Sequence, residues 1–74
     1  MAYLPDTNEL IEVNVASSTV TYIGKAAVGS ATSAAVWKIQ KMTTTVGGDI
    51  SIKYAAGSIQ YNQIWDNRAS LSYS

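Results

Sequence analysis

The sequence predicts an all-β protein, a single small domain built as an antiparallel sandwich or barrel-like meander of five to six short strands. Three observations support this prediction. Apolar and polar residues alternate with a period of two, β-branched residues and tyrosines are frequent, and short Gly-, Ser- or Asn-containing segments separate the alternating runs. Apolar residues do not recur convincingly at the spacing of an amphipathic helix.

The first two strands are expected between residues 9 and 23. The run from Ser18 to Ile23 is dense in β-branched residues, whose stiff side chains suit a pleated surface. Residues 16–18 separate it from the preceding run and are expected to form a turn. In that first run, from Glu9 to Val15, alternation places Ile11, Val13 and Val15 on one face and Leu10, Glu12 and Asn14 on the other.

Residues 24–35, GKAAVGSATSAA, are nearly all small and interrupt the alternation. A loop is our prediction, because these residues offer little apolar area to fix one conformation. A short helix is the alternative, since Ala is the best helix former, but Gly29 and the neighbouring Ser and Thr residues disfavour it. Loops of about a dozen residues are commonly functional. We therefore take Lys25, Ser30 and Thr32 as candidate contact residues.

A hairpin is the strongest local signal in the chain. Two alternating runs, residues 36–45 and 49–54, flank Gly47 and Gly48, and adjacent glycines accept the positive φ angles of a tight turn. The two glycines are therefore assigned a structural role, together with Trp37 and Ile39. The apolar face of the hairpin is expected to consist of Trp37, Ile39, Ile50 and Ile52.

The C-terminal third is expected to add two more strands. The first covers residues 58–65, with a bulge near residues 62–63, and the second covers residues 70–74, with Leu71 and Tyr73 inward. Between them, residues 66–68 form a turn. Asp66 is expected to cap its backbone amides and to pair with Arg68. The alternative, that these two residues orient an anionic substrate, is weaker.

Composition argues against catalysis. The chain has no His and no Cys, and it holds only five acidic and five basic residues among 74. A neutral-pH acid–base, a thiolate nucleophile and soft metal ligands are therefore missing. Gly24-Lys25 and Gly29-Ser30 lack the surrounding residues of a phosphate-binding loop or a nucleophile elbow. We predict no enzymatic activity, no cofactor and no metal, and we rank a Ser or Lys hydrolase far below the other hypotheses.

Charge and length restrict the partners. The formal net charge is zero, which favours neither nucleic acid nor an anionic membrane surface. No apolar stretch approaches the ~20 residues that span a bilayer, and the N-terminus does not resemble a secretory signal.

A chain of this size buries only about 60% of its unfolded surface, so a partner protein is expected to supply further burial. Residues 1–8 are predicted to form an extended arm, with Tyr3 and Leu4 as contacts, and a frayed terminus is the alternative.

The aromatic residues are further interaction candidates, because they are numerous for so small a core. Core packing, a protein interface and ligand stacking all remain open for each ring. We select Tyr54, Tyr61 and Trp65 as interaction residues. The alternative function is a glycan- or receptor-binding module in which these three rings form a stacking platform on one sheet face.

Two segments resemble short proteins encoded among the virion genes of tailed bacteriophages. In residues 24–41 a small-residue loop precedes a Val-Trp-x-Ile strand, and in residues 64–73 a Trp-Asp-x-Arg segment precedes a final strand. The resemblance covers about residues 18–74. It implies a structural role as a capsid decoration, neck or tail component, with other virion proteins as partners and many copies or a homo-oligomer. It also implies location in the virion after synthesis in the host cytoplasm. Trp37, Trp65, Asp66 and Arg68 are the residues expected to fix the fold.

Overall fold

The computed structural model describes residues 9–74, so the predicted arm with Tyr3 and Leu4 lies outside the described residues. The described chain is mostly strand, which confirms the predicted all-β antiparallel fold. Strands β1 to β4 follow one another in an antiparallel meander, and β5 also pairs with β3. The elements are β1 (Glu9–Val15), β2 (Val20–Ala27), β3 (Ala35–Thr44), β4 (Ile50–Tyr54), β5 (Gln63–Ile64) and the 3-10 helix η1 (Trp65–Ser70).

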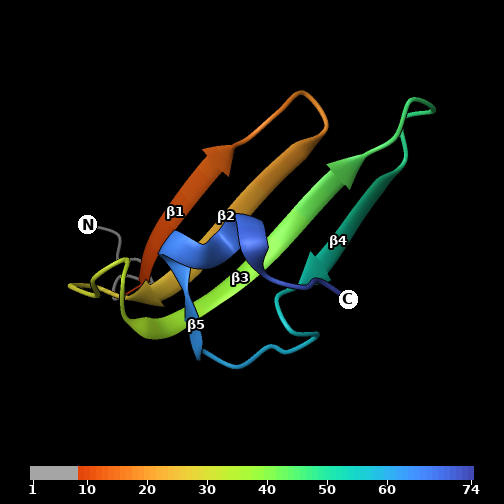
Figure 1. The fold of residues 1–74 in the computed structure, drawn as a ribbon. Coiled ribbons are helices and arrows are strands. Elements are labelled where there is room, and N and C mark those ends of the chain that lie inside the picture. Colours follow the sequence, from red (N-terminus) through yellow and green to blue (C-terminus); the bar gives the residue numbers. More distant parts are fainter. Residues whose placement is uncertain (1–8) are drawn as a thin grey trace, which may run out of the picture.

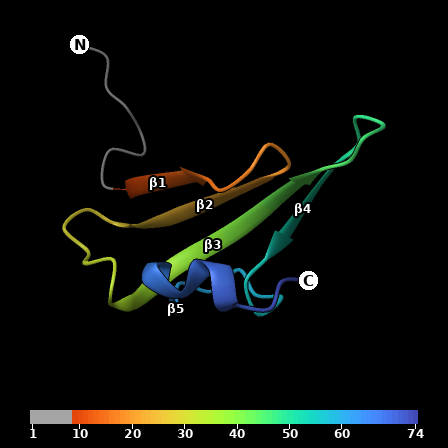
Figure 2. The same ribbon diagram turned by 45° about the horizontal axis from the view of Figure 1, so that its top comes forward.

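The sheet is one layer, and the C-terminal part of the chain covers one of its faces. Figures 1 and 2 show η1 lying across β3 on the same side in both views. The molecule is correspondingly flat, with extents of 41 × 30 × 19 Å. No helix within residues 9–74 has the length and apolar character needed to cross a membrane.

Strand β3 organises the molecule because it pairs along both edges. β2 follows one edge, while β4 pairs with its second half and β5 with its first half on the other. Between them the Ala55 N–H donates to the Ile39 carbonyl at 2.9 Å. The predicted strand over residues 70–74 is reduced to a bridge between Ala55 and Tyr73, with hydrogen bonds in both directions between Tyr54 and Ser74. Its inward residues, Leu71 and Tyr73, pack on the core as predicted.

Three predicted boundaries are wrong. Residues 24–27 belong to β2, so the loop of small residues comprises only residues 28–34. Of the strand predicted over residues 58–65, only residues 63–64 are strand. Residues 65–70 form η1 in place of a simple turn. The short alternation around residues 58–62 does not specify a strand because β3 offers only Ala35 and Trp37 as pairing partners there.

The β3–β4 hairpin is confirmed, but its register differs by one residue from that of a two-residue turn. The loop comprises residues 45–49, closed by the Gly48 N–H donating to the Thr45 carbonyl at 3.0 Å, and only Gly48 of the two glycines has positive φ, at 91°. Ile52 therefore lies opposite Met42. Because a slip of one residue moves a whole strand face to the other side, Ile50 and Ile52 lie on the face opposite Trp37 and Ile39, and the predicted common apolar face is wrong.

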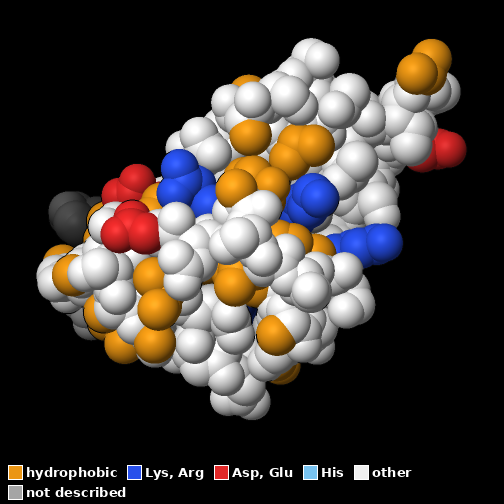
Figure 3. All heavy atoms as spheres, in the orientation of Figure 1, with side chains coloured by type: hydrophobic (Ala, Val, Ile, Leu, Met, Phe, Trp, Pro, Cys, Tyr) orange, Lys and Arg blue, Asp and Glu red, His pale blue; other side chains and the backbone are white. Residues whose placement is uncertain are grey.

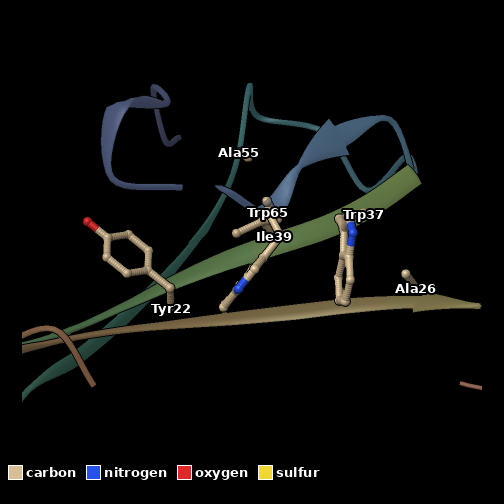
Figure 4. Close-up of a cluster of buried hydrophobic side chains, with 6 residues drawn as sticks. All are labelled: Tyr22, Ala26, Trp37, Ile39, Ala55 and Trp65. Carbon is tan, nitrogen blue, oxygen red and sulfur yellow. The ribbon is translucent and has the colours of Figure 1, made fainter. Parts of the chain in front are cut away.

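The core lies between the sheet and its C-terminal cover. Its buried side chains are Tyr22, Ala26, Trp37, Ile39, Ala55 and Trp65 (Figure 4). The indole rings of Trp37 and Trp65 lie with centroids 5.8 Å apart and tilted by 35°. A Cβ atom on Gly24 would lie 2.5 Å from Cε3 of Trp65. The Trp65 ring therefore packs directly on the backbone of β2, and only glycine leaves it room.

Candidate docking surface

The face of the sheet opposite η1 is covered among the described residues only by Tyr61 at one end, and we call it the open face. Cross-strand partners share a face, so the register defines its rows. The first row contains Val13, Ile23, Gln40 and Tyr54, and the next contains Val15, Thr21, Met42 and Ile52. Ile11, Lys25 and Lys38 precede these rows at one end, and Thr44 and Ile50 follow them at the other.

Aliphatic side chains dominate the open face. Five of them are more than half exposed: Ile11 at 54%, Val13 at 59%, Val15 at 70%, Ile50 at 60% and Ile52 at 51%. Ile23 on β2 and Met42 on β3 are half-buried and lie between the exposed side chains of β1 and β4. The apolar surface therefore extends across all four strands. We call these seven residues the aliphatic patch: Ile11, Val13, Val15, Ile23, Met42, Ile50 and Ile52. Single exposed aliphatics are ordinary, but a contiguous apolar area on a small domain indicates an interaction surface.

Charged groups of the open face gather at one end of the strands. Lys25 and Lys38 lie directly opposite each other on β2 and β3. The Tyr61 hydroxyl donates to Oε2 of Glu9 at 3.0 Å, and Nζ of Lys38 lies 5.1 Å from the Tyr61 ring centroid. The rest of the face, toward the β3–β4 hairpin, consists of neutral side chains.

The covered side differs in character. In Figure 3, which looks onto η1, hydrophobic side chains occur in small groups separated by polar and basic ones. Arg68 is one of the basic residues on this side. Its Nε donates to Oδ1 of Asn14 at 3.1 Å, and its Nη1 donates to the Trp65 carbonyl at 3.2 Å. Its guanidinium also lies 4.7 Å from the Trp65 ring centroid. The predicted pairing of Arg68 with Asp66 is therefore wrong. Arg68 fixes η1 to β1 instead.

Tyr73 makes further contacts that hold the C-terminal segment on the covered face. Its hydroxyl donates to the Arg68 carbonyl at 2.8 Å, and its ring lies 5.8 Å from the Tyr22 ring. Burial, and to a smaller extent Tyr22, raises the pKa of Tyr73 to about 12, although Arg68 acts in the opposite direction. The folded structure therefore favours the protonated, neutral hydroxyl of Tyr73.

The small-residue loop is held within the chain. Nε1 of Trp37 donates to the Ala31 carbonyl at 2.9 Å, and the backbone N–H of Asp66 donates to the Thr32 carbonyl at 3.1 Å. The Ser30 hydroxyl donates to the Ala27 carbonyl at 2.6 Å. Two candidate contact residues, Ser30 and Thr32, thus sit in a loop anchored by Trp37 and the start of η1, and the third, Lys25, lies on the open face.

The predicted stacking platform does not form. Tyr54 and Tyr61 lie on the open side of the sheet, but Trp65 is only 5% exposed and belongs to the core on the covered side. The three rings therefore share no surface, and the assignment of Trp65 as an interaction residue is wrong. Trp65 packs beside Trp37 in the core, and its expected role in fixing the fold stays a prediction.

The open face offers binding chemistry of one kind, an apolar surface with Lys25, Lys38 and Glu9 at one end. Residues 9–74 contain no group of three His, Cys, Asp or Glu side chains placed to hold a metal ion. No protein-family model, curated protein or solved structure matches this chain.

Sequence reasoning missed the aliphatic patch as a candidate docking surface. Alternation showed that Ile11, Val13 and Val15 lie on one side of their strand, but it does not say which side the rest of the chain covers. A signal was present, because β1 carries β-branched residues on one face and Glu12 and Asn14 on the other. The cover nevertheless lies on the Asn14 side, where Arg68 binds it.

Proposed function

We propose that this chain is a non-enzymatic structural protein of a phage particle, which docks on neighbouring subunits through the open face. The aliphatic patch is the observation that carries the docking role, because five half-exposed aliphatic side chains have no cover among the described residues. The resemblance of residues 24–41 and 64–73 to short virion-encoded proteins supports the setting in a capsid decoration, neck or tail.

The energetics support docking on a repeated structure. Complete burial of an aliphatic side chain contributes about 1.5–3 kcal/mol, so covering the exposed half of each of the five gives about 5 kcal/mol. Association itself costs about 4–15 kcal/mol in lost freedom. One such contact is therefore weak, whereas a subunit that touches several neighbours gains from effective concentration.

Purified particles test the proposal. Particles of the phage whose genome encodes this chain are banded on a density gradient. Their proteins are then analysed by quantitative mass spectrometry. We expect the chain at a constant ratio to the main shell or tail protein in successive preparations. Its absence from intact particles, or a ratio that falls to background on washing, would contradict the proposal.

Two variants supplied in trans connect this test to the open face. Val13→Lys places a charge in the aliphatic patch, whereas Val28→Lys changes a valine of similar exposure, 63% against 59%, in the loop after β2. We expect the first variant to be lost from particles and the second to be retained. Equal incorporation of both would show that docking uses another surface.

A further inference from the structure

The aliphatic patch has the geometry of one half of a β-sandwich. Facing sheets pack about 10 Å apart with their strands within about 30° of each other, and aliphatic side chains fill the space between them. Residues 9–74 supply one such sheet, and within them η1 and the chain after it cover its other face, while only Tyr61 lies over one end of the patch side. We infer that the neighbour which covers the patch is a second copy of this chain, face to face with the first about a two-fold axis that runs across the strands. The inference rests on the proposed function for the use of this face.

Charge favours that orientation of the axis over one along the strands. An axis along the strands would place β2 of one copy over β3 of the other at the same level. Lys25, which lies opposite Lys38 within the chain, would then face Lys38 of the second copy. Like charges at a partly desolvated interface are unfavourable, so this arrangement is disfavoured.

An axis across the strands reverses their direction and places β3 over β3. The charged end of each sheet, which carries Lys25, Lys38 and Glu9, then lies over the hairpin end of the other. Lys38 is carried toward the β3–β4 loop of the second copy, residues 45–49, in which Asp49 is the acidic residue. This contact occurs twice because of the symmetry. Between the two charged ends, the neutral rows of the two sheets face each other.

The size of the patch predicts a weak dimer. Four strands spaced about 4.8 Å apart and four rows about 6.8 Å apart give a footprint of about 19 × 27 Å, or about 500 Å². Two such surfaces fall below the roughly 1,200 Å² total of a standard interface, so we expect a dissociation constant of about 10 µM to 1 mM. An affinity in this range suits a contact that is repeated many times in an assembly.

Sedimentation of the purified chain over a concentration series tests whether the patch associates with itself. We expect a reversible monomer–dimer equilibrium for the wild type. Val13→Lys should weaken dimerisation by at least about 30-fold, because an unpaired ammonium group would be buried twice per dimer. Val28→Lys is the matched control and should leave the dissociation constant within about 2-fold. Circular dichroism of dilute samples confirms that each variant is folded.

A charge reversal tests the axis. An exposed charge pair changes affinity by about 1.5- to 5-fold, and the symmetry squares that factor, so Lys38→Glu and Asp49→Lys should each weaken the dimer by about 2- to 25-fold. The double variant should return to within about 3-fold of the wild type. Lys53→Glu, on the covered side of β4 opposite Lys41, is the control and should have little effect.

Each result has a defined reading. A wild type that stays monomeric to 1 mM, or a dimer that Val13→Lys does not weaken, overturns the inference. Strengthening by Lys38→Glu alone overturns the stated axis, since it is the result expected for facing lysines. Particle mass spectrometry separates the two claims: a monomeric chain that still enters particles through the patch leaves the proposed function intact with a different neighbour. A chain that dimerises through the patch but is absent from particles supports the inferred dimer and contradicts the proposed function.

Discussion

Both faces of the sheet carry apolar side chains, but those of one face are buried and those of the other are exposed. On the covered face, large and small residues are matched, as where the Trp65 ring lies on Gly24 beside Trp37. On the open face, the aliphatic side chains around Val13 and Ile23 are exposed and lie beside Thr21 and Gln40 without such matching. A unique fold needs complementary shapes on one face of the sheet, whereas an exposed apolar face is suited to contact with another molecule.

The largest expected effect separates the faces directly. Trp65→Ala removes a ring that is 5% exposed and should destabilise the fold by about 3–5 kcal/mol, which is comparable to the whole stability of a core this small. We expect no cooperative unfolding transition for this variant. Ile52→Ala, at a side chain that is 51% exposed, should cost less than about 1 kcal/mol. Urea unfolding followed by circular dichroism compares the two, and equal losses would contradict the distinction.

Gly24→Ala tests the shape matching itself. Its Cβ atom would lie 2.5 and 2.6 Å from two carbons of the Trp65 ring, so the ring must move, and we expect a loss of about 1–3 kcal/mol. Gly47→Ala is the control, since its Cβ would meet only Oγ1 of Thr45 at 4.0 Å and its φ is not positive. Thermal unfolding midpoints measure both. A Gly24→Ala protein as stable as the control would show that Trp65 does not need the backbone contact.

The link between η1 and β1 should have a smaller, pairwise effect. Asn14→Ala and Arg68→Ala each remove one side of the hydrogen bond that holds the cover over β1. We expect a coupling energy of about 1 kcal/mol in a double-mutant cycle measured by urea unfolding. If the two losses of unfolding free energy simply add, the hydrogen bond to Asn14 contributes nothing. Arg68 would then stabilise the fold through its contacts with Trp65 alone.

Tyr73 predicts a pH dependence that the open face should lack. Its pKa is raised to about 12 from the ordinary 10.0, so folding favours the neutral hydroxyl. This stabilisation is present in full below pH 10 and is lost as the pH rises toward 12. Melting temperatures measured between pH 8 and 12 should fall in that window, and Tyr73→Phe should reduce the fall. Tyr61→Phe, which removes a hydroxyl on the open side, should retain it; the opposite ranking would refute the assignment.

The sequence predicted the class of the fold but not which face of the sheet would be covered. Alternation identified the strands around Ile11, Trp37 and Ile52 because the period of two is local. The relative placement of Ile52 and Trp37 depends on a five-residue hairpin loop and one residue of register, which no local pattern specifies.

The covering segment was harder to predict for a related reason. Trp65 and Arg68 were identified by their motif, yet their partners, Gly24 and Asn14, are far away in sequence. Gly24 was assigned to a loop because small residues carry no pattern of their own. Its role is visible only where the Trp65 ring meets β2, since the requirement for glycine comes from a tertiary contact.

The isoleucine methyl groups provide the most direct test of the difference between the faces. NMR with a soluble paramagnetic agent measures their accessibility in dilute and in concentrated samples. We predict that Ile39 is protected in both, that Ile59, a 66% exposed residue outside the sheet, is accessible in both, and that Ile11, Ile50 and Ile52 change from accessible to protected as concentration rises. If these three respond like Ile59 at every concentration, the open face is not where copies of the chain meet.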